Sequence, residues 1–217
     1  MCGRFGFTLP TKQAMHLFGL SESVDVEPRR NIAPMTWIFA VLAKPGDTDI
    51  TRVGRRLRWG LVPSWSKDPK MGNRMINARS ETAAEKPAFR TAFRRRRCLI
   101  PADLFYEWEK TEGGKQPHAI GLASGEPFAM AGLWEHWQSP EGGDLFTATI
   151  LTTAANALVA RIHDRMPVLL APDAYEAWLA PATAPKDLQA LLKPFPAEAM
   201  TATPVSKAVN NPANQDF

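Results

Sequence analysis

The stretch Cys98-Leu-Ile-Pro-Ala-Asp-Leu-Phe-Tyr-Glu-Trp108 contains two short apolar runs, separated by Pro101 and Asp103. Apolar runs rich in β-branched and aromatic residues and bounded by turn-forming residues are typical of β-strands. We therefore predict strands over residues 98–100 and 104–108. Similar runs predict further strands over residues 37–43, 58–62, 128–134 and 146–152.

Helical patterns are fewer than strand patterns. Apolar residues at helical spacing predict a helix over residues 11–18 with Thr11 as its N-cap, and another over 87–93 with Pro87 in its first turn. A third helix is predicted over 156–162, with Asn156 as its cap. Two more patterns of the same kind predict helices over residues 172–179 and 186–192.

The order of these elements indicates the fold class. Strands dominate the first 150 residues, helices come later, and no regular strand–helix alternation occurs. This order favours an α+β fold over a doubly wound α/β fold. We predict a single domain over residues 1–217, in which the polar residues 208–217 form a loosely held tail.

The composition bounds the function. Hydrophobic residues make up 45% and charged residues 22% of the 217 residues, which is ordinary for a globular protein. No apolar run approaches the roughly 20 residues that span a bilayer, and the start of the chain does not resemble a signal peptide. We therefore expect no membrane association and a cytoplasmic location, at the nucleoid in a bacterium or in the nucleus of a eukaryote.

Two cysteines, Cys2 and Cys98, are present, and a reducing compartment disfavours a disulfide between them. Cys98 begins an apolar run and is expected to be buried and inert. Because the sequence contains no metal-ligand spacing, we expect neither a metal nor another cofactor.

Charge is distributed unevenly along the chain. Residues 1–100 carry a balance of +11, residues 101–217 a balance of −7, and the whole chain +4. A basic half suggests a surface that binds a polyanion such as nucleic acid, although mixed charges on a solvated surface explain it equally. The four-arginine run 94–97 is either a phosphate contact or a solvated helix end.

Cys2 follows the initiator methionine, and its small side chain favours removal of Met1. The product would carry an α-amine and a thiol on adjacent carbons, and both groups titrate close enough to neutrality to react. The amine can attack an aldehyde to form an imine, and the thiol can then close a five-membered thiazolidine. An open abasic deoxyribose offers such an aldehyde. The alternative is that Cys2 is an ordinary second residue without a chemical role.

Three further segments carry groups suited to this chemistry. Asn77 and Arg79 would share one face of an extended strand, where they could bind a sugar and a phosphate. Glu107 lies between aromatic residues and could position the amine or move its proton. His163 could serve as a general acid–base, with Asp164 and Arg165 either orienting it or pairing with each other. Taken alone, each is better explained without such a role: Asn77 by a turn beside a surface arginine, Glu107 by an edge strand that faces water, and His163 by a helix C-cap or a packed core residue.

Two loops could contact bases. Trp65 lies in an aromatic turn and could stack on a base, and Pro34 could act as a rigid wedge between bases. Core packing of loops is the alternative for both.

Eight blocks in the same order resemble the SOS-response-associated peptidase (SRAP) family and extend over nearly the whole chain. They are Met1-Cys-Gly-Arg-Phe5, Asn31-Ile-Ala-Pro34, Trp59-Gly-Leu-Val-Pro63, Ile76-Asn-Ala-Arg-Ser-Glu-Thr82, Arg97-Cys-Leu-Ile-Pro-Ala-Asp103, Phe105-Tyr-Glu-Trp108, His163-Asp-Arg-Met-Pro167 and Pro204-Val-Ser206.

The resemblance implies one α+β domain with a β-barrel-like core, short flanking helices and a positively charged DNA channel. It also implies a thiazolidine crosslink between Cys2 and an abasic site in single-stranded DNA, near junctions with duplex. The catalytic positions it implies are Cys2, Asn77, Glu107 and His163. The DNA-binding positions are Arg4, Pro34, Trp65, Arg79 and Arg165.

We therefore predict a monomeric protein that shields abasic sites by covalent attachment, with slow reversal and an associated lyase activity. Two alternatives remain. One is a cysteine peptidase that uses Cys2 and His163, self-cleavage included. The other is a non-covalent module that binds single-stranded DNA.

Overall fold

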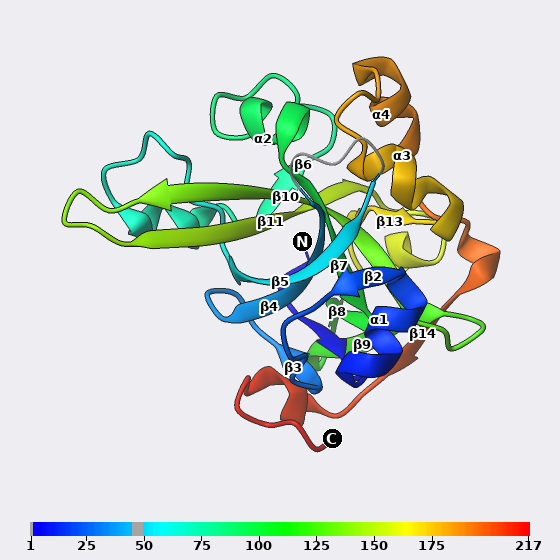
Figure 1. The fold of residues 1–217 in the computed structure, drawn as a ribbon. Helices are drawn as coiled ribbons and strands as arrows, with labels where there is room; N and C mark the ends of the chain where they lie inside the picture. Colours follow the sequence, from blue (N-terminus) through cyan, green and yellow to red (C-terminus); the bar gives the residue numbers. More distant parts are fainter. Residues whose placement is uncertain (1, 45–49) are drawn as a thin grey trace.

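The computed structural model describes residues 2–44 and 50–217 (Figure 1). Met1, whose removal the sequence predicts, lies outside the described residues. The strands run in the order β1 Phe5–Phe7, β2 Leu20–Glu22, β3 Arg29–Ile32, β4 Trp37–Ala43, β5 Arg52–Trp59, β6 Asn77–Arg79, β7 Arg97–Ala102, β8 Leu104–Thr111, β9 Gly114–Leu122, β10 Phe128–Gln138, β11 Asp144–Ala154, β12 Arg165–Pro167, β13 Leu169–Leu170 and β14 Met200–Pro204. The α-helices are α1 Thr11–Phe18, α2 Arg90–Arg95, α3 Tyr175–Leu179 and α4 Pro185–Leu191.

Five strands close into a barrel. The order is β7-β4-β5-β11-β10, and β10 pairs with β7 to complete the ring. All these pairings are antiparallel except that of β5 with β11, which is parallel and places Trp59 beside Ala148. Large side chains such as Trp59, Leu57, Leu99 and Ile100 are buried in the core. The α+β class and the barrel-like core with short helices are thus confirmed.

A second sheet runs in the order β14-β9-β8-β1-β3, with antiparallel pairing throughout. Its strands lie below the barrel in Figure 1, where β8, β9 and β14 are neighbours. Strand β1 lies between β3 and β8, so the start of the chain is enclosed on both sides. The position of β1 therefore fixes where Cys2 lies.

The predicted strands agree with the structure except at the end of one strand, β5. Residues 37–43 form β4 as predicted, and the other runs lie within β7, β8, β10 and β11. The run over 58–62 was predicted to be one strand, but β5 ends at Trp59. Gly60 has a φ of 133°, a conformation that turns the chain away from the sheet.

The predicted helix boundaries need several corrections. Helix α1 covers residues 11–18, but its N-cap is Pro10, and Thr11 Oγ1 instead accepts a hydrogen bond from Val26 N at 2.9 Å. Helix α2 begins at Arg90, after a series of turns. Over 156–162 the structure has only a 3₁₀ turn at Val159–Arg161, although Asn156 Oδ1 does accept from Leu158 N and Val159 N. The 172–179 pattern is a 3₁₀ turn followed by α3.

The arginine run 94–97 divides between surface and core. Arg94 and Arg95 are exposed at the end of α2, whereas Arg97 is 4% exposed. The Arg97 guanidinium donates hydrogen bonds of 2.5–2.7 Å to the carbonyls of Phe93, Arg94, Trp178 and Ala180. Arg97 therefore joins α2 and α3 to the barrel and is unavailable to phosphate.

The last residues, 208–217, make definite contacts. The buried amide of Asn31 donates to the carbonyls of Val209, Asn211 and Asn214 at 2.8–3.1 Å. Phe217 lies edge-on to Tyr106, with ring centroids 5.9 Å apart. In the described part of the chain, no helix has the length and apolar character needed to cross a membrane.

Replacing Arg97 by Ala leaves four carbonyls without their donor, and we expect it to lower the free energy of unfolding by about 2–4 kcal/mol. Arg95→Ala, on the exposed end of α2, should change it by less than about 0.5 kcal/mol. Urea unfolding of both variants measures the difference. Equal stability of the two variants would contradict the structural role of Arg97.

Candidate active site at the amino terminus

Cys2 is fully buried, at 0% exposure, because β1 pairs with the beginning of β8. Phe5 lies opposite Phe105, and the pairing continues as Tyr106 N donates to Arg4 O at 2.9 Å. The same register, continued toward the amino terminus, brings the residues before β1 alongside Glu107. The nucleophile predicted from the sequence is thus held beside the predicted carboxylate.

Asn77 reaches the same place from β6. Its Nδ2 donates to the Cys2 carbonyl at 2.7 Å. Strand β6 pairs in parallel with β11, where Asn77 lies beside Ile150. The intervening Ala78 is buried, so Asn77 and Arg79 share the outer face of β6, as predicted from their spacing.

Glu107 is 3% exposed on β8. Burial raises the pKa of its carboxyl group, and the nearby Asp164 raises it further, while the charge of His163 lowers it. Glu107 also raises the pKa of the Cys2 thiol. These effects place Glu107 within electrostatic reach of both Cys2 and His163.

His163 follows the 3₁₀ turn Val159–Arg161 and is held by its own neighbours. Its Nδ1 lies 3.0 Å from Arg165 N, which can donate to it, and 2.9 Å from Asp164 Oδ1, which can accept from it. A ring without a proton on Nδ1 suits the first contact, and a ring with a proton on Nδ1 suits the second. Because Asp164 is 87% exposed, its ion pair adds little stability. Both contacts therefore hold the ring through Nδ1.

The Cys2 thiol is not an activated thiolate. Burial raises its pKa well above the ordinary range, and the Glu107 charge raises it further. An enzyme that uses a thiolate nucleophile lowers the pKa of its thiol with a neighbouring cation. Burial likewise raises the pKa of Cys98, which is 0% exposed in β7, as expected for an inert core residue.

The predicted DNA-binding arginines have different settings. Arg79 is exposed. Arg4 Nη1 donates to Asn31 Oδ1 at 2.6 Å and to Val209 O at 2.7 Å. Arg165 forms a bidentate pair with Glu81 at 2.6 and 2.9 Å, and the Arg165 hydrogen bond lowers the pKa of Glu81. Arg79 is thus free of such contacts among the described residues, whereas Arg4 and Arg165 are already bound to protein groups.

The two predicted base contacts lie in loops. Trp65 is 58% exposed. Pro34 is partly exposed and precedes Met35, a non-glycine residue with a φ of 67°. This loop is held in place, because Met35 N donates to Trp59 O at 2.8 Å and Thr36 Oγ1 donates to Ala33 O at 2.8 Å. A rigid loop of this kind suits a wedge.

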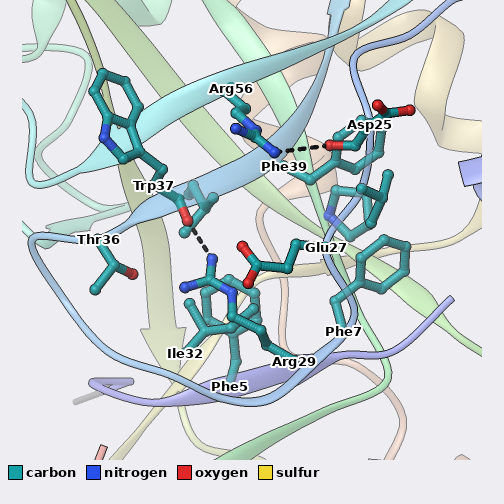
Figure 2. A pocket seen from close by; sticks show the side chains of 13 residues that line it. Phe5, Phe7, Asp25, Glu27, Arg29, Ile32, Thr36, Trp37, Phe39 and Arg56 are labelled. Atoms are coloured by element: carbon teal, nitrogen blue, oxygen red, sulfur yellow. Dashed lines mark hydrogen bonds between the residues drawn. The ribbon is translucent and has the colours of Figure 1, made fainter. Parts of the chain in front are cut away.

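A cavity of about 340 Å³ lies between β1, β3, β4 and the loop that precedes β3 (Figure 2). Its lining includes the buried rings of Phe5, Phe7 and Phe39, and the charged side chains of Glu27 and Arg29. Cys2, Asn77, Glu107 and His163 do not line it. The cavity is therefore separate from the candidate catalytic residues.

Sequence reasoning missed two residues of this region. Asn31 lay in a recognised block, but its contact with Arg4 spans 27 positions and its contact with Val209, near the end of the chain, spans 178. His118 lies opposite Glu107 on β9. The hairpin sequence Glu112-Gly113-Gly114 could have indicated this pairing. The described residues contain no group of three side chains suited to a metal ion.

The arrangement can be compared with known proteins. The family model described as SOS response associated peptidase (SRAP) matches residues 1–212. The chain belongs to the SRAP family. Among its relatives is the abasic site processing protein YoqW of Bacillus subtilis, with 44% identity over 99% of this chain and 96% of that protein. YedK of Escherichia coli, also named an abasic site processing protein, is 32% identical over 99% of this chain and 96% of its own.

A vertebrate relative and a crystal structure extend the comparison. HMCES of Xenopus tropicalis, again named an abasic site processing protein, is 37% identical over 88% of this chain and 63% of that protein. A crystal structure of a Bacteroides thetaiotaomicron protein matches 98% of this SRAP chain and 97% of its own with a TM-score of 0.89, at 24% identity. That likeness supports the fold.

The raised pKa of Glu107 has a consequence for stability. A carboxyl group with a higher pKa in the folded than in the unfolded state contributes stability below its unfolded pKa of about 4.3, and this contribution is lost as the pH rises toward the folded value. We therefore expect Glu107→Gln to gain stability relative to the parent protein between pH 5 and pH 8. Urea unfolding at both pH values tests this, and a relative loss at pH 8 would contradict the burial effect.

Proposed function

We propose that this SRAP protein shields abasic sites in single-stranded DNA by bonding covalently to them through Cys2, which becomes the first residue after Met1 is removed. The observation that carries the proposal is the hydrogen bond from Asn77 to the Cys2 carbonyl, at a site that also includes Glu107 and His163. The names of the relatives YoqW, YedK and HMCES support abasic-site processing as the activity.

The reaction needs two bonds and the loss of one water. The Cys2 α-amine attacks the C1′ aldehyde of an open abasic sugar, and water leaves to give an imine. The thiol sulfur then adds to the imine carbon, while its proton passes to the imine nitrogen. The raised pKa of the thiol keeps it protonated in the free site, which favours attack by the amine before the sulfur.

The neighbouring groups have distinct roles in this scheme. Glu107, with its raised pKa, takes the proton that the α-ammonium must lose before it can attack. His163 acts on the sugar as an acid–base, opening the ring and assisting reversal of the crosslink. Asn77 holds the Cys2 carbonyl and thereby fixes the direction of the amine.

DNA contact is assigned to the residues predicted from the sequence. Arg79 and the exposed Trp65 contact a phosphate and a base, respectively. Pro34, on its rigid loop, separates bases next to the lesion, which suits a junction with duplex. Arg4 and Arg165 contact phosphate only if their present partners, Asn31 and Glu81, yield to the DNA.

The peptidase alternative is less well supported. A cysteine peptidase requires a thiolate stabilised by a protonated histidine. Here both burial and the Glu107 charge disfavour the thiolate of Cys2. An imine intermediate also gives a route to strand cleavage, so a lyase activity would accompany the crosslinking activity.

We expect Cys2→Ala to abolish the denaturant-stable adduct with an abasic single-stranded oligonucleotide, because it removes the sulfur that closes the ring. Cys98→Ala is the matched control and should retain it. His163→Ala should slow adduct formation by about 10²-fold or more, as loss of an acid–base group does. Denaturing gel electrophoresis measures all three variants.

The outcomes separate the three functions. Retention of DNA by Cys2→Ala under native conditions alone would identify a non-covalent binder. Cleavage of a peptide substrate by the parent protein, without any adduct, would favour the peptidase.

A further inference from the structure

His118 on β9 lies directly opposite Glu107 on β8 in the antiparallel register. Residues opposed in this way project their side chains to the same face, with Cβ atoms about 4.5–5.5 Å apart. Both residues are buried, Glu107 at 3% and His118 at 8% exposure. The proposed proton acceptor therefore has an imidazole as its neighbour across the strands.

A second carboxylate holds this imidazole. His118 Nε2 lies 2.9 Å from Glu109 Oε2, and Glu109 follows Glu107 by two residues on the same face of β8. The Glu109 side chain is 38% exposed and that of His118 is 10% exposed. Glu107, His118 and Glu109 thus form a line from the buried site to solvent, which we name the Glu107–His118–Glu109 line.

The other nitrogen of the ring is available. Among the described residues, His118 Nδ1 is buried and has no hydrogen-bond partner. With its Nε2 proton directed to Glu109, the ring presents an accepting lone pair at Nδ1. Pro204 of β14 lies on the other side of His118 and carries no ionisable group.

Few other charges face this ring. On β8 they are Glu107 and Glu109, and His163 and Asp164 act on Glu107 itself. Lys207, in the 3₁₀ turn that contacts β9, is exposed. Arg4 extends the β1 register opposite Tyr106, and so lies toward the other face of β8, where Asn31 and Val209 hold its guanidinium.

The proposed reaction must release a proton. An α-ammonium, an aldehyde and a thiol combine to give a neutral thiazolidine, one water and one proton. Glu107 takes that proton in a buried site and can return it to the amine until the proton leaves the site. The site therefore needs a route for the proton to solvent.

We propose that the Glu107–His118–Glu109 line is this route, with His118 as a positioning residue that accepts the proton of Glu107 at Nδ1 and releases its Nε2 proton past Glu109 to water. This inference rests on the proposed crosslinking function. Glu109 keeps the ring in the tautomer that accepts on the Glu107 side.

The test measures the rate of adduct formation between the mature protein, in excess, and an abasic single-stranded oligonucleotide from pH 5.5 to 8.5. His118→Ala should slow the reaction by about tenfold, the lower part of what proton transfer by a side chain contributes, and should alter its pH profile. Free imidazole should restore most of the rate. Glu109→Gln is a milder change at a partly exposed residue. It should alter the pH profile in the same way as His118→Ala, but by less.

His136→Ala is the matched control, because His136 also pairs with a carboxylate, Asp144, at 2.6 Å, but on the β10–β11 hairpin. It should leave the rate and the pH profile unchanged. An unchanged rate in His118→Ala, or a loss that is equal at every pH and insensitive to imidazole, would overturn the relay while the crosslinking function stands. Absence of any adduct with the parent protein would instead overturn the proposed function.

Discussion

The pairing of β1 with β8 is the constraint on which the site depends. Two backbone hydrogen bonds, from Tyr106 N to Arg4 O and from Asp103 N to Gly6 O, hold the first residues against β8 at 2.9 and 2.8 Å. Gly6 permits the close approach of β3 on the other side, since a Cβ at this position would lie 2.8 Å from Arg30 O. Cys2 is thereby buried as part of the core.

This enclosure creates an electrostatic conflict that the chemistry can use. A carboxyl group and a thiol, both with raised pKa, share a buried space with His163 nearby. Neither the Glu107 carboxylate nor the Cys2 thiolate is favoured in this buried space without a nearby positive charge, such as that of a protonated amine or imine. Burying two such groups together lowers stability, as is usual at active sites. In the proposed reaction, this protonated thiol forms the second bond.

Much of the framework could be predicted from local pattern. Strand β4 has the predicted limits because its apolar run lies between turn residues, and Asn77 and Arg79 share a face because the strand period is two. Cys2, Asn77, Glu107 and His163 come from four distant segments, and only the family resemblance indicated that they gather. Arg97 could not be interpreted from the sequence, because its four carbonyl partners belong to segments that the fold brings together. The pairing of Arg165 with Glu81 joins positions 84 residues apart and was equally hidden.

The central claim is that both the amine and the thiol of Cys2 bond to one aldehyde carbon, and the state of that thiol in the adduct tests it most directly. The mature protein would be crosslinked to an abasic oligonucleotide, denatured, treated with an alkylating reagent, and weighed intact by mass spectrometry. The account predicts a mass equal to the two components minus one water, no alkylation at Cys2 and no gain of hydrogen on borohydride treatment. An adduct whose Cys2 thiol is alkylated, or one that borohydride reduces, would contain an open imine and would contradict the thiazolidine.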